Sequence, residues 1–181
     1  HLTTADGGAL LCPHEQYERA KLLRWYGFDR TTGTAMRCTQ VVSEVGMKYQ
    51  MNDIAATIGL ANLGLALRHV RRSRQNAEIY RDRIYNPVLT LPLYEEGCSY
   101  WLYTLLVGRG RRNEFLFYCK EHGIDASLVH VRNDIQTALR TTNGHALTGA
   151  DRFSAEEACI PIGFWLSEDD INYIVKVLND F

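Results

Sequence analysis

The sequence predicts an α/β fold built from two parts. Short β-prone apolar runs alternate with amphipathic helical segments along the chain. Two prolines, Pro87 and Pro92, interrupt the chain directly after a long helical stretch. The chain has 181 residues, of which 46% are hydrophobic and 23% charged, and this is enough to bury a core in one or two domains.

In the first part we expect a strand, a helix and an irregular connection. Ala9–Cys12 is a short apolar run after a glycine turn, which indicates a buried strand. Pro13 suits the first turn of the helix that follows, and Gly27 can close that helix. Residues Phe28–Val45 have neither a helical nor a strand period. A connection of this length inside a compact domain is usually functional or mobile.

A long helix is expected next. Asn52 or Asp53 can cap its start, and apolar residues recur at helical spacing after them. The stretch Arg68–Arg83 is strongly basic, but Glu78 and interleaved apolar residues favour a solvated amphipathic helix over a nucleic-acid-binding surface.

The second part again alternates strands and helices. Ser167 begins the sequence SEDD, which resembles a capping box with aspartate in place of glutamate and opens a final helix. The other expected elements are a strand at Ser99–Val107, a helix at Asn113–His122 closed by Gly123, a strand at Ile124–Val131, a short helix at Ser154–Ala158 and a strand at Cys159–Ile162.

Composition excludes several classes of function. The formal net charge of −1 gives no general attraction to nucleic acid or to anionic membranes. No apolar run approaches the roughly 20 residues that a membrane-spanning helix needs. The five cysteines are scattered and form no CxxC pair or Cys/His cluster, so we expect a reduced cytoplasmic compartment and no metal site.

Four segments together resemble the DegT/DnrJ/EryC1/StrS aminotransferases, the sugar aminotransferases of pyridoxal-phosphate fold type I. Residues 1–8 (HLTTADGG) fit the pattern that follows the cofactor lysine in this family, Lys-x-[Leu/Ile]-Thr-Thr-x-[Glu/Asp]-Gly-Gly. The other three segments come in the family's order: GMKYQMNDIAATIGLANL (46–63), SYWLYTLLV (99–107) and CIPIGFWLSEDDINYIVKVL (159–178). The resemblance covers nearly the whole chain.

The resemblance implies a fold and an activity. Residues 1–65 would form the end of the large pyridoxal-phosphate domain, 66–86 a linking helix and 87–181 the small C-terminal α/β domain. Such enzymes move an amino group, usually from glutamate, to a keto carbon of a nucleotide-linked sugar. They work as homodimers with shared active sites. The cofactor acts as an electron sink, and the protein positions and protonates the reacting groups.

The resemblance also places the catalytic lysine outside the 181 residues, directly before His1. We therefore expect no catalytic residue within the chain itself, and we expect the lysine–cofactor adduct to precede His1. Two alternatives stay open. One is a deoxygenating dehydratase relative, which has a different residue at the lysine position. The other is a cofactor-free regulatory protein on the same scaffold.

Candidate cofactor contacts are Lys48, Gln50 and Asn52. In the family, an asparagine at the position of Lys48 or of Gln50 often reaches across the dimer interface to the partner's cofactor phosphate. This chain departs from asparagine at both positions, but a lysine and a neutral amide can each bind phosphate. The alternatives are that Lys48 is solvated and that Asn52 only caps a helix.

Candidate sugar contacts lie in two other segments. The family segment that corresponds to His130, Arg132 and Asn133 borders the sugar pocket, and arginine suits diphosphate because its planar fork bonds two oxygens. Trp25 and Tyr26 precede the loop that helps enclose the nucleotide sugar in the family. The alternatives are structural roles for His130 and Arg132 and a core position for the two aromatic residues.

Overall fold

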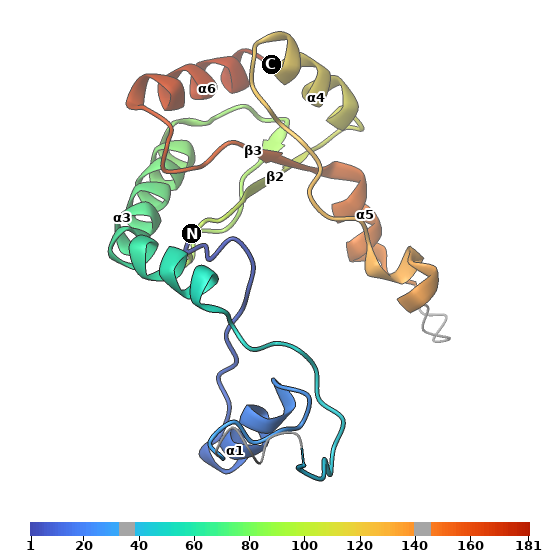
Figure 1. Ribbon diagram of the computed structural model, residues 1–181. Helices are drawn as coiled ribbons and strands as arrows, with labels where there is room; N and C mark the ends of the chain where they lie inside the picture. The colour runs from blue at the N-terminus through green and yellow to red at the C-terminus, as the bar shows by residue number, and fades with distance from the viewer. Residues whose placement is uncertain (33–38, 140–145) are drawn as a thin grey trace. The chain divides into compact units, whose positions relative to one another are not determined.

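The computed structural model describes residues 1–32, 39–139 and 146–181, and within it the chain forms two compact units. One unit consists of residues 2–66, and the other of residues 67–181 together with His1. The principal elements, labelled in Figure 1 where there is room, are α1 (His14–Leu23), α3 (Asp53–Arg83), β1 (Leu89–Thr90), β2 (Tyr103–Val107), α4 (Arg112–Glu121), the 3-10 turns Asn133–Ile135 and Thr137–Leu139, α5 (Thr148–Glu156), β3 (Glu157–Ile160) and α6 (Glu168–Asp180).

The first unit contains α1 and the loops around it. Gly27 closes the turn after α1 as predicted, because its N–H donates to Leu22 O at 2.9 Å and its φ is +82°. The described parts of the expected irregular connection, residues 28–32 and 39–45, contain no helix or strand, and residues 33–38, with Cys38, lie outside the description.

The strand predicted at Ala9–Cys12 is wrong. These residues form no strand, and the side chain of Leu11 is 98% exposed. Apolar composition alone does not make a strand, because a strand also needs a neighbour to accept its backbone hydrogen bonds. The described residues provide no such neighbour for this segment.

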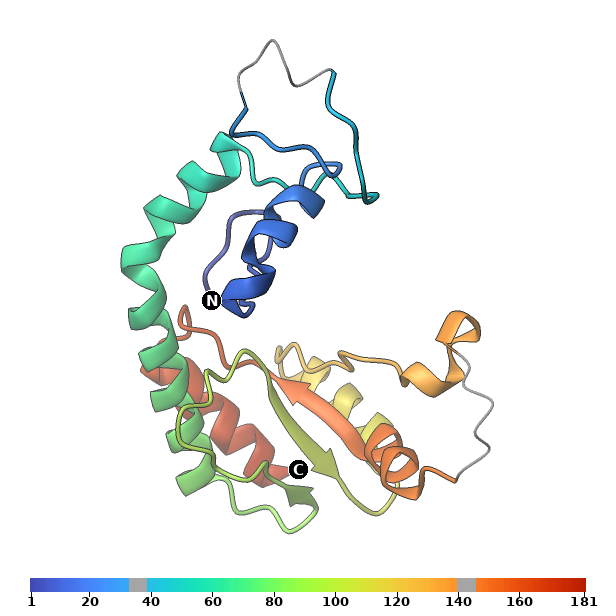
Figure 2. The same cartoon turned by 90° about the horizontal axis from the view of Figure 1, so that it is seen from below.

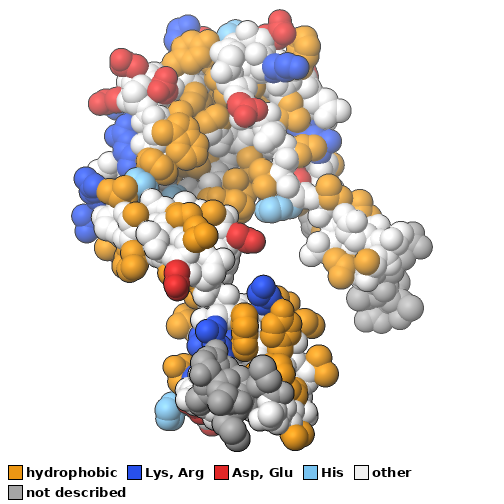
Figure 3. Space-filling view, viewed as in Figure 1, with side chains coloured by type: hydrophobic (Ala, Val, Ile, Leu, Met, Phe, Trp, Pro, Cys, Tyr) orange, Lys and Arg blue, Asp and Glu red, His pale blue; other side chains and the backbone are white. Residues whose placement is uncertain are grey.

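Helix α3 begins as the sequence predicts. The side chain of Asn52 caps it, since Asn52 Oδ1 accepts a hydrogen bond from Ala55 N at 2.9 Å. Its buried residues Ser73, Asn76, Ala77 and Tyr80 recur at helical spacing. The predicted amphipathic helix in the basic stretch is confirmed, and Lys and Arg side chains gather on the surface along this helix (Figure 3).

The three strands form one antiparallel sheet in the order β1-β2-β3. In the central strand the side chains of Tyr103, Leu105 and Val107 are buried at every second position. Helices α4 and α6 lie on the same face of this sheet (Figure 1). The core of this unit is one cluster of buried side chains. They come from the sheet, from α4 and α6, and from the end of α3, and they include Tyr80, Leu105, Phe115, Cys119, Ile171 and Leu178.

The second unit corrects two strand predictions. The predicted strand Ile124–Val131 is wrong, because only Ser127 pairs, in a single bridge to Cys159. The last strand is Glu157–Ile160 instead of Cys159–Ile162, since Pro161 has no N–H to continue the ladder. The strand predicted at Ser99–Val107 is confirmed over its last five residues.

The helices of this unit follow the prediction more closely. Gly123, with φ +71°, follows α4, as predicted. Helix α5 begins at Thr148, earlier than the expected Ser154. Figure 2 shows α6 beside the end of α3, where Asn179 Nδ2 donates to Arg83 O at 2.9 Å. Within the described ranges, no helix has both the length and the apolar character to cross a membrane.

The predicted capping box at the start of α6 is confirmed. Asp170 N donates to Ser167 Oγ at 3.1 Å, and Ser167 N donates to Asp170 Oδ2 at 2.8 Å. The hydrogen bonds from the Ser167 side chain and backbone lower the pKa of Asp170 below its ordinary value.

We expect Asp170→Asn to destabilise the protein at neutral pH and to have a smaller effect in acid. A carboxylate whose pKa is lowered by folding stabilises the native state at neutral pH, and this stabilisation is lost as the pH falls through the lowered pKa. Urea unfolding at neutral and acidic pH measures the effect. Asp169→Asn is the matched control, because it removes a charge from the same helix turn but not the capping bond. Equal effects of the two variants would contradict the prediction.

Candidate functional site

The turn after α1 pairs with residues 46–49 and so brings two predicted groups of site residues together. Met47 N donates to Leu23 O at 2.7 Å, Tyr26 N to Met47 O at 3.1 Å and Tyr49 N to Arg24 O at 2.8 Å. Trp25 and Lys48 form an antiparallel bridge at the centre of this pairing. Candidate substrate residues and candidate cofactor residues therefore share one backbone junction.

Gly46 makes this junction possible. A Cβ added at Gly46 would lie 2.5 Å from Gly27 N and 2.5 Å from Leu23 O, and both of these are backbone atoms. Tyr26 itself has φ +56°, a left-handed conformation that is uncommon for a residue with a side chain. The absent side chain of Gly46 and the tight turn at Tyr26 and Gly27 together fix where Trp25 and Lys48 meet.

A hollow with a volume of about 1320 Å³ lies beside the junction, within the first unit. It is lined by residues of the Thr4–Gly8 loop, of α1, of the segment 45–52 and of the first turns of α3. Four cationic side chains line it: Arg19, Lys21, Arg24 and Lys48. Asp6 also lines it, so cationic side chains are in excess, and the hollow is large enough to receive an anionic group.

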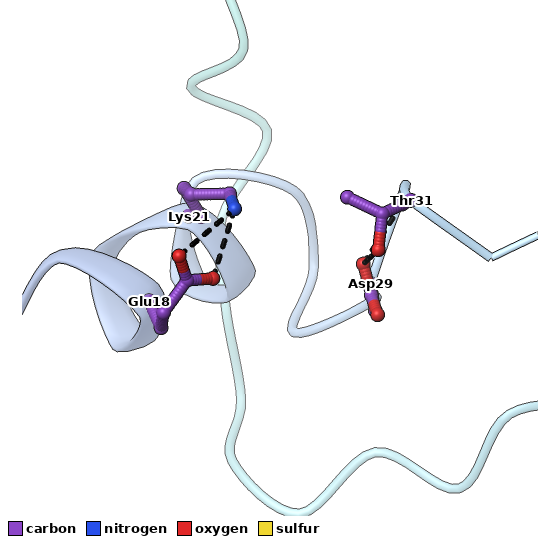
Figure 4. A network of polar contacts seen from close by, with 4 residues as sticks. All are labelled: Glu18, Lys21, Asp29 and Thr31. Carbon is purple, nitrogen blue, oxygen red and sulfur yellow. Dashed lines mark hydrogen bonds and ion pairs between the residues drawn. The ribbon is translucent and has the colours of Figure 1, made fainter.

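Two of these cations already have acidic partners. Lys21 Nζ lies 2.8 Å from Glu18 Oε2, as Figure 4 shows together with the neighbouring Asp29–Thr31 contact, and Arg19 pairs with Glu44. The hydrogen bond to Arg19 lowers the pKa of Glu44. Among the described residues, no carboxylate lies within ion-pair distance of Arg24 or of Lys48.

Gln50 has an unusual environment in this hollow. Its Oε1 is buried and meets no hydrogen-bond partner among the described residues. Its Nε2 reaches only Met51 O, at 3.5 Å, which is too long to hold the amide firmly. Rotation of the amide about its last bond would turn the two N–H donors toward the buried position. Such an amide suits a binding site, where a polar group of a ligand would complete its hydrogen bonds.

The other predicted residues of this unit have defined positions. Asn52 caps α3, as described above. The rings of Trp25 and Tyr26 meet edge to face at 5.3 Å, and the Arg30 guanidinium lies 4.8 Å from the Trp25 ring. Tyr26 is exposed, so the core position considered for it is wrong.

His130, Arg132 and Asn133 lie together in the second unit, where Asn133 begins a 3-10 turn. The His130 ring centroid is 6.4 Å from that of Trp101, whose side chain is 64% exposed. Arg132 donates to both oxygens of Asp134 and also to Asp151. These hydrogen bonds raise the pKa of Arg132 and lower that of Asp134.

Sequence reasoning missed two neighbours of these candidates and one contact of His1. The ring of Trp101 lies beside that of His130, although 29 residues separate them in the sequence. Asp151 belongs to another helix, and its pairing with Arg132 has no signal in a single sequence. His1 Nε2 lies 2.8 Å from Ser99 O, a contact that the sequence pattern does not indicate.

The comparisons with known proteins agree on one family. A sequence model of the DegT/DnrJ/EryC1/StrS aminotransferase family matches residues 1–179. The UDP-4-amino-4,6-dideoxy-N-acetyl-beta-L-altrosamine transaminase of Helicobacter pylori is 30% identical over 99% of this chain and 49% of its own length. The chain spans about half the length of the curated relatives it matches.

Solved structures show the same relationship. The sugar aminotransferase CalS13 from Micromonospora echinospora has a TM-score of 0.89 and 31% identity, covering 99% of this chain and 48% of its own. AtS13 from Actinomadura melliaura has a TM-score of 0.88 and 35% identity over the same fractions, 99% and 48%. The fold prediction, an α/β portion of a fold type I enzyme, is therefore confirmed.

We expect Gly46→Ala to destabilise the junction by about 1–3 kcal/mol, because the new methyl group would overlap backbone atoms that cannot move separately. Thermal unfolding and limited proteolysis after α1 measure the effect. Gly64→Ala is the matched control. It lies inside α3 with open space around its Cβ position, and it should stabilise the helix by up to about 1 kcal/mol. A neutral Gly46→Ala variant would contradict the role of this glycine.

Proposed function

The chain belongs to the DegT/DnrJ/EryC1/StrS aminotransferase family, and from this membership we propose that its protein transfers an amino group from glutamate to a keto carbon of a nucleotide-linked sugar. Curated relatives that match it are named as transaminases of UDP- and dTDP-linked amino sugars. The proposal includes a homodimer with shared active sites and a cytoplasmic location. In this assignment residues 1–65 end the large domain, 66–86 link it and 87–181 form the small domain.

The family depends on pyridoxal phosphate. When bound, this cofactor supplies an electron sink for the reacting carbon. We propose that the residue directly before His1 is the lysine that holds the cofactor and moves the proton. The residues on the chain fit a contribution to the phosphate site, because Gln50 has a buried, unpartnered amide oxygen and Lys48 supplies positive charge beside it.

We propose that Lys48 and Gln50 bind the cofactor phosphate of the partner subunit. The observation that carries this assignment is the junction of Trp25 with Lys48 beside a hollow lined by cations. Asn52, the third candidate, is proposed to act beside them by fixing the start of α3. Trp25 and Tyr26, on the other side of the junction, are proposed to face the nucleotide sugar.

His130, Arg132 and Asn133 are proposed to border the sugar pocket from the second unit. His130 and Asn133 have donors and acceptors suited to sugar hydroxyl groups. Arg132 lies between them and fixes the local backbone through its ion pairs.

The test uses the complete polypeptide incubated with pyridoxal phosphate, glutamate and a panel of UDP- and dTDP-linked 4-keto sugars. Mass spectrometry should detect an amino sugar and 2-oxoglutarate. Borohydride reduction followed by digestion should place the cofactor on a lysine directly before His1. Turnover without glutamate, or a different residue at that position, would overturn the proposal in favour of the deoxygenating alternative.

We expect Lys48→Ala and Gln50→Ala each to weaken cofactor retention by about 1.5–3 kcal/mol, the value of a charge-assisted hydrogen bond. Dialysis followed by absorbance of the bound cofactor measures retention. Asn52→Ala is the control, because it removes a helix cap and should lower stability more than cofactor retention. Unchanged retention in both Lys48→Ala and Gln50→Ala would remove the phosphate role.

We expect Arg132→Ala to raise the KM for the nucleotide sugar far more than the KM for glutamate. The change disturbs the proposed sugar pocket without touching the lysine chemistry, so kcat at saturating sugar should fall less than kcat/KM. Steady-state kinetics with each substrate varied in turn give both constants. An equal effect on both substrates would count against a sugar-pocket position for this segment.

A further inference from the structure

The guanidinium of Arg132 donates to two carboxylates through all three of its nitrogens. Nε donates to Asp134 Oδ1 at 2.8 Å and Nη2 to Asp134 Oδ2 at 2.6 Å, which is a two-pronged pairing. The third nitrogen, Nη1, donates to Asp151 Oδ1. Each nitrogen of the planar fork therefore already donates to a protein oxygen.

These bonds join two separate elements. Arg132 is the residue before the 3-10 turn Asn133–Ile135, and Asp151 lies in the first turn of α5. The Arg132 side chain is only 20% exposed, whereas Asp151 is 59% exposed. The arginine is therefore the sheltered member that holds the turn and the helix together.

The charge of this cluster does not favour an anionic ligand. One guanidinium and two carboxylates sum to a net charge of −1. A diphosphate that approached Arg132 would compete with these carboxylates for the guanidinium, and their like charge would repel it. Direct recognition of diphosphate by Arg132 is thus opposed by its own partners.

We propose that Arg132 is a positioning residue, which clamps the segment carrying His130 and Asn133 to α5 so that these neighbours contact the sugar. The inference rests on the proposed function for the substrate and on the ion pairs for the clamp. It assigns Asp134 and Asp151 a role that the sequence did not suggest.

The test compares Arg132→Ala, Asp134→Asn and Asp151→Asn in the complete, cofactor-loaded protein. Hydrogen exchange followed by mass spectrometry reports on residues 127–139. A clamp predicts faster exchange there in all three variants. Glu156→Gln is the matched control, because it breaks the Arg152–Glu156 pair on the same helix without contact to the clamped segment. Unchanged exchange in Arg132→Ala and Asp151→Asn would overturn the clamp.

The sign of the kinetic effect distinguishes positioning from direct contact. With the UDP- or dTDP-linked 4-keto sugar that is turned over in the assay above, a clamp predicts that Asp151→Asn raises the sugar KM about two- to fivefold, as expected for a partly exposed ion pair. A direct ligand predicts a lower KM, because removal of a carboxylate frees the guanidinium. A lower or unchanged KM would overturn the positioning role.

Failure of the proposed function has a different signature from failure of this inference. If the wild-type protein transfers no amino group from glutamate, the proposed function fails and the substrate part of this inference fails with it. The exchange experiment still decides whether the clamp exists.

Discussion

The second unit depends on hydrogen bonds from two buried side chains of α3. Asn76 is fully buried and its Nδ2 donates to Ile162 O at 3.3 Å and to Gly163 O at 3.1 Å. One turn later, the Tyr80 hydroxyl donates to Pro161 O at 2.7 Å. These bonds satisfy carbonyl groups of the segment that leaves β3 and leads to α6. A buried carbonyl without a partner is costly, so the path of this segment is set by the helix beside it.

Local chemistry made much of the fold predictable. Asn52, Gly27, Gly123 and the Ser167 capping box each act within a few residues of their own position, and each is found where the sequence places it. Strands were harder to predict, because pairing is a relation between distant segments. Ala9–Cys12 and Ile124–Val131 have strand-like composition, but composition does not indicate which segment, if any, a strand would pair with.

The candidate site was predictable in its parts but not in its arrangement. Resemblance to a family selected Lys48, Gln50, Trp25 and Tyr26 as separate candidates from two segments. Their meeting at the Trp25–Lys48 bridge depends on the room left by Gly46, which one sequence does not reveal. The pairing of Arg132 with Asp151 is equally invisible in the sequence, since Asp151 lies 19 residues away on another element.

The core of the second unit contains a cysteine whose reactivity reports whether the core is packed. Cys119 is one of its fully buried side chains, and burial raises the pKa of this thiol to about 12. Only the thiolate reacts readily with alkylating reagents, so Cys119 is protected both by access and by protonation while the helices stay packed. Cys98 is exposed, so reagents in solution reach its side chain without any opening of the fold. The ratio of their labelling rates thus measures how often this unit opens, without a fluorescent tag or an engineered residue.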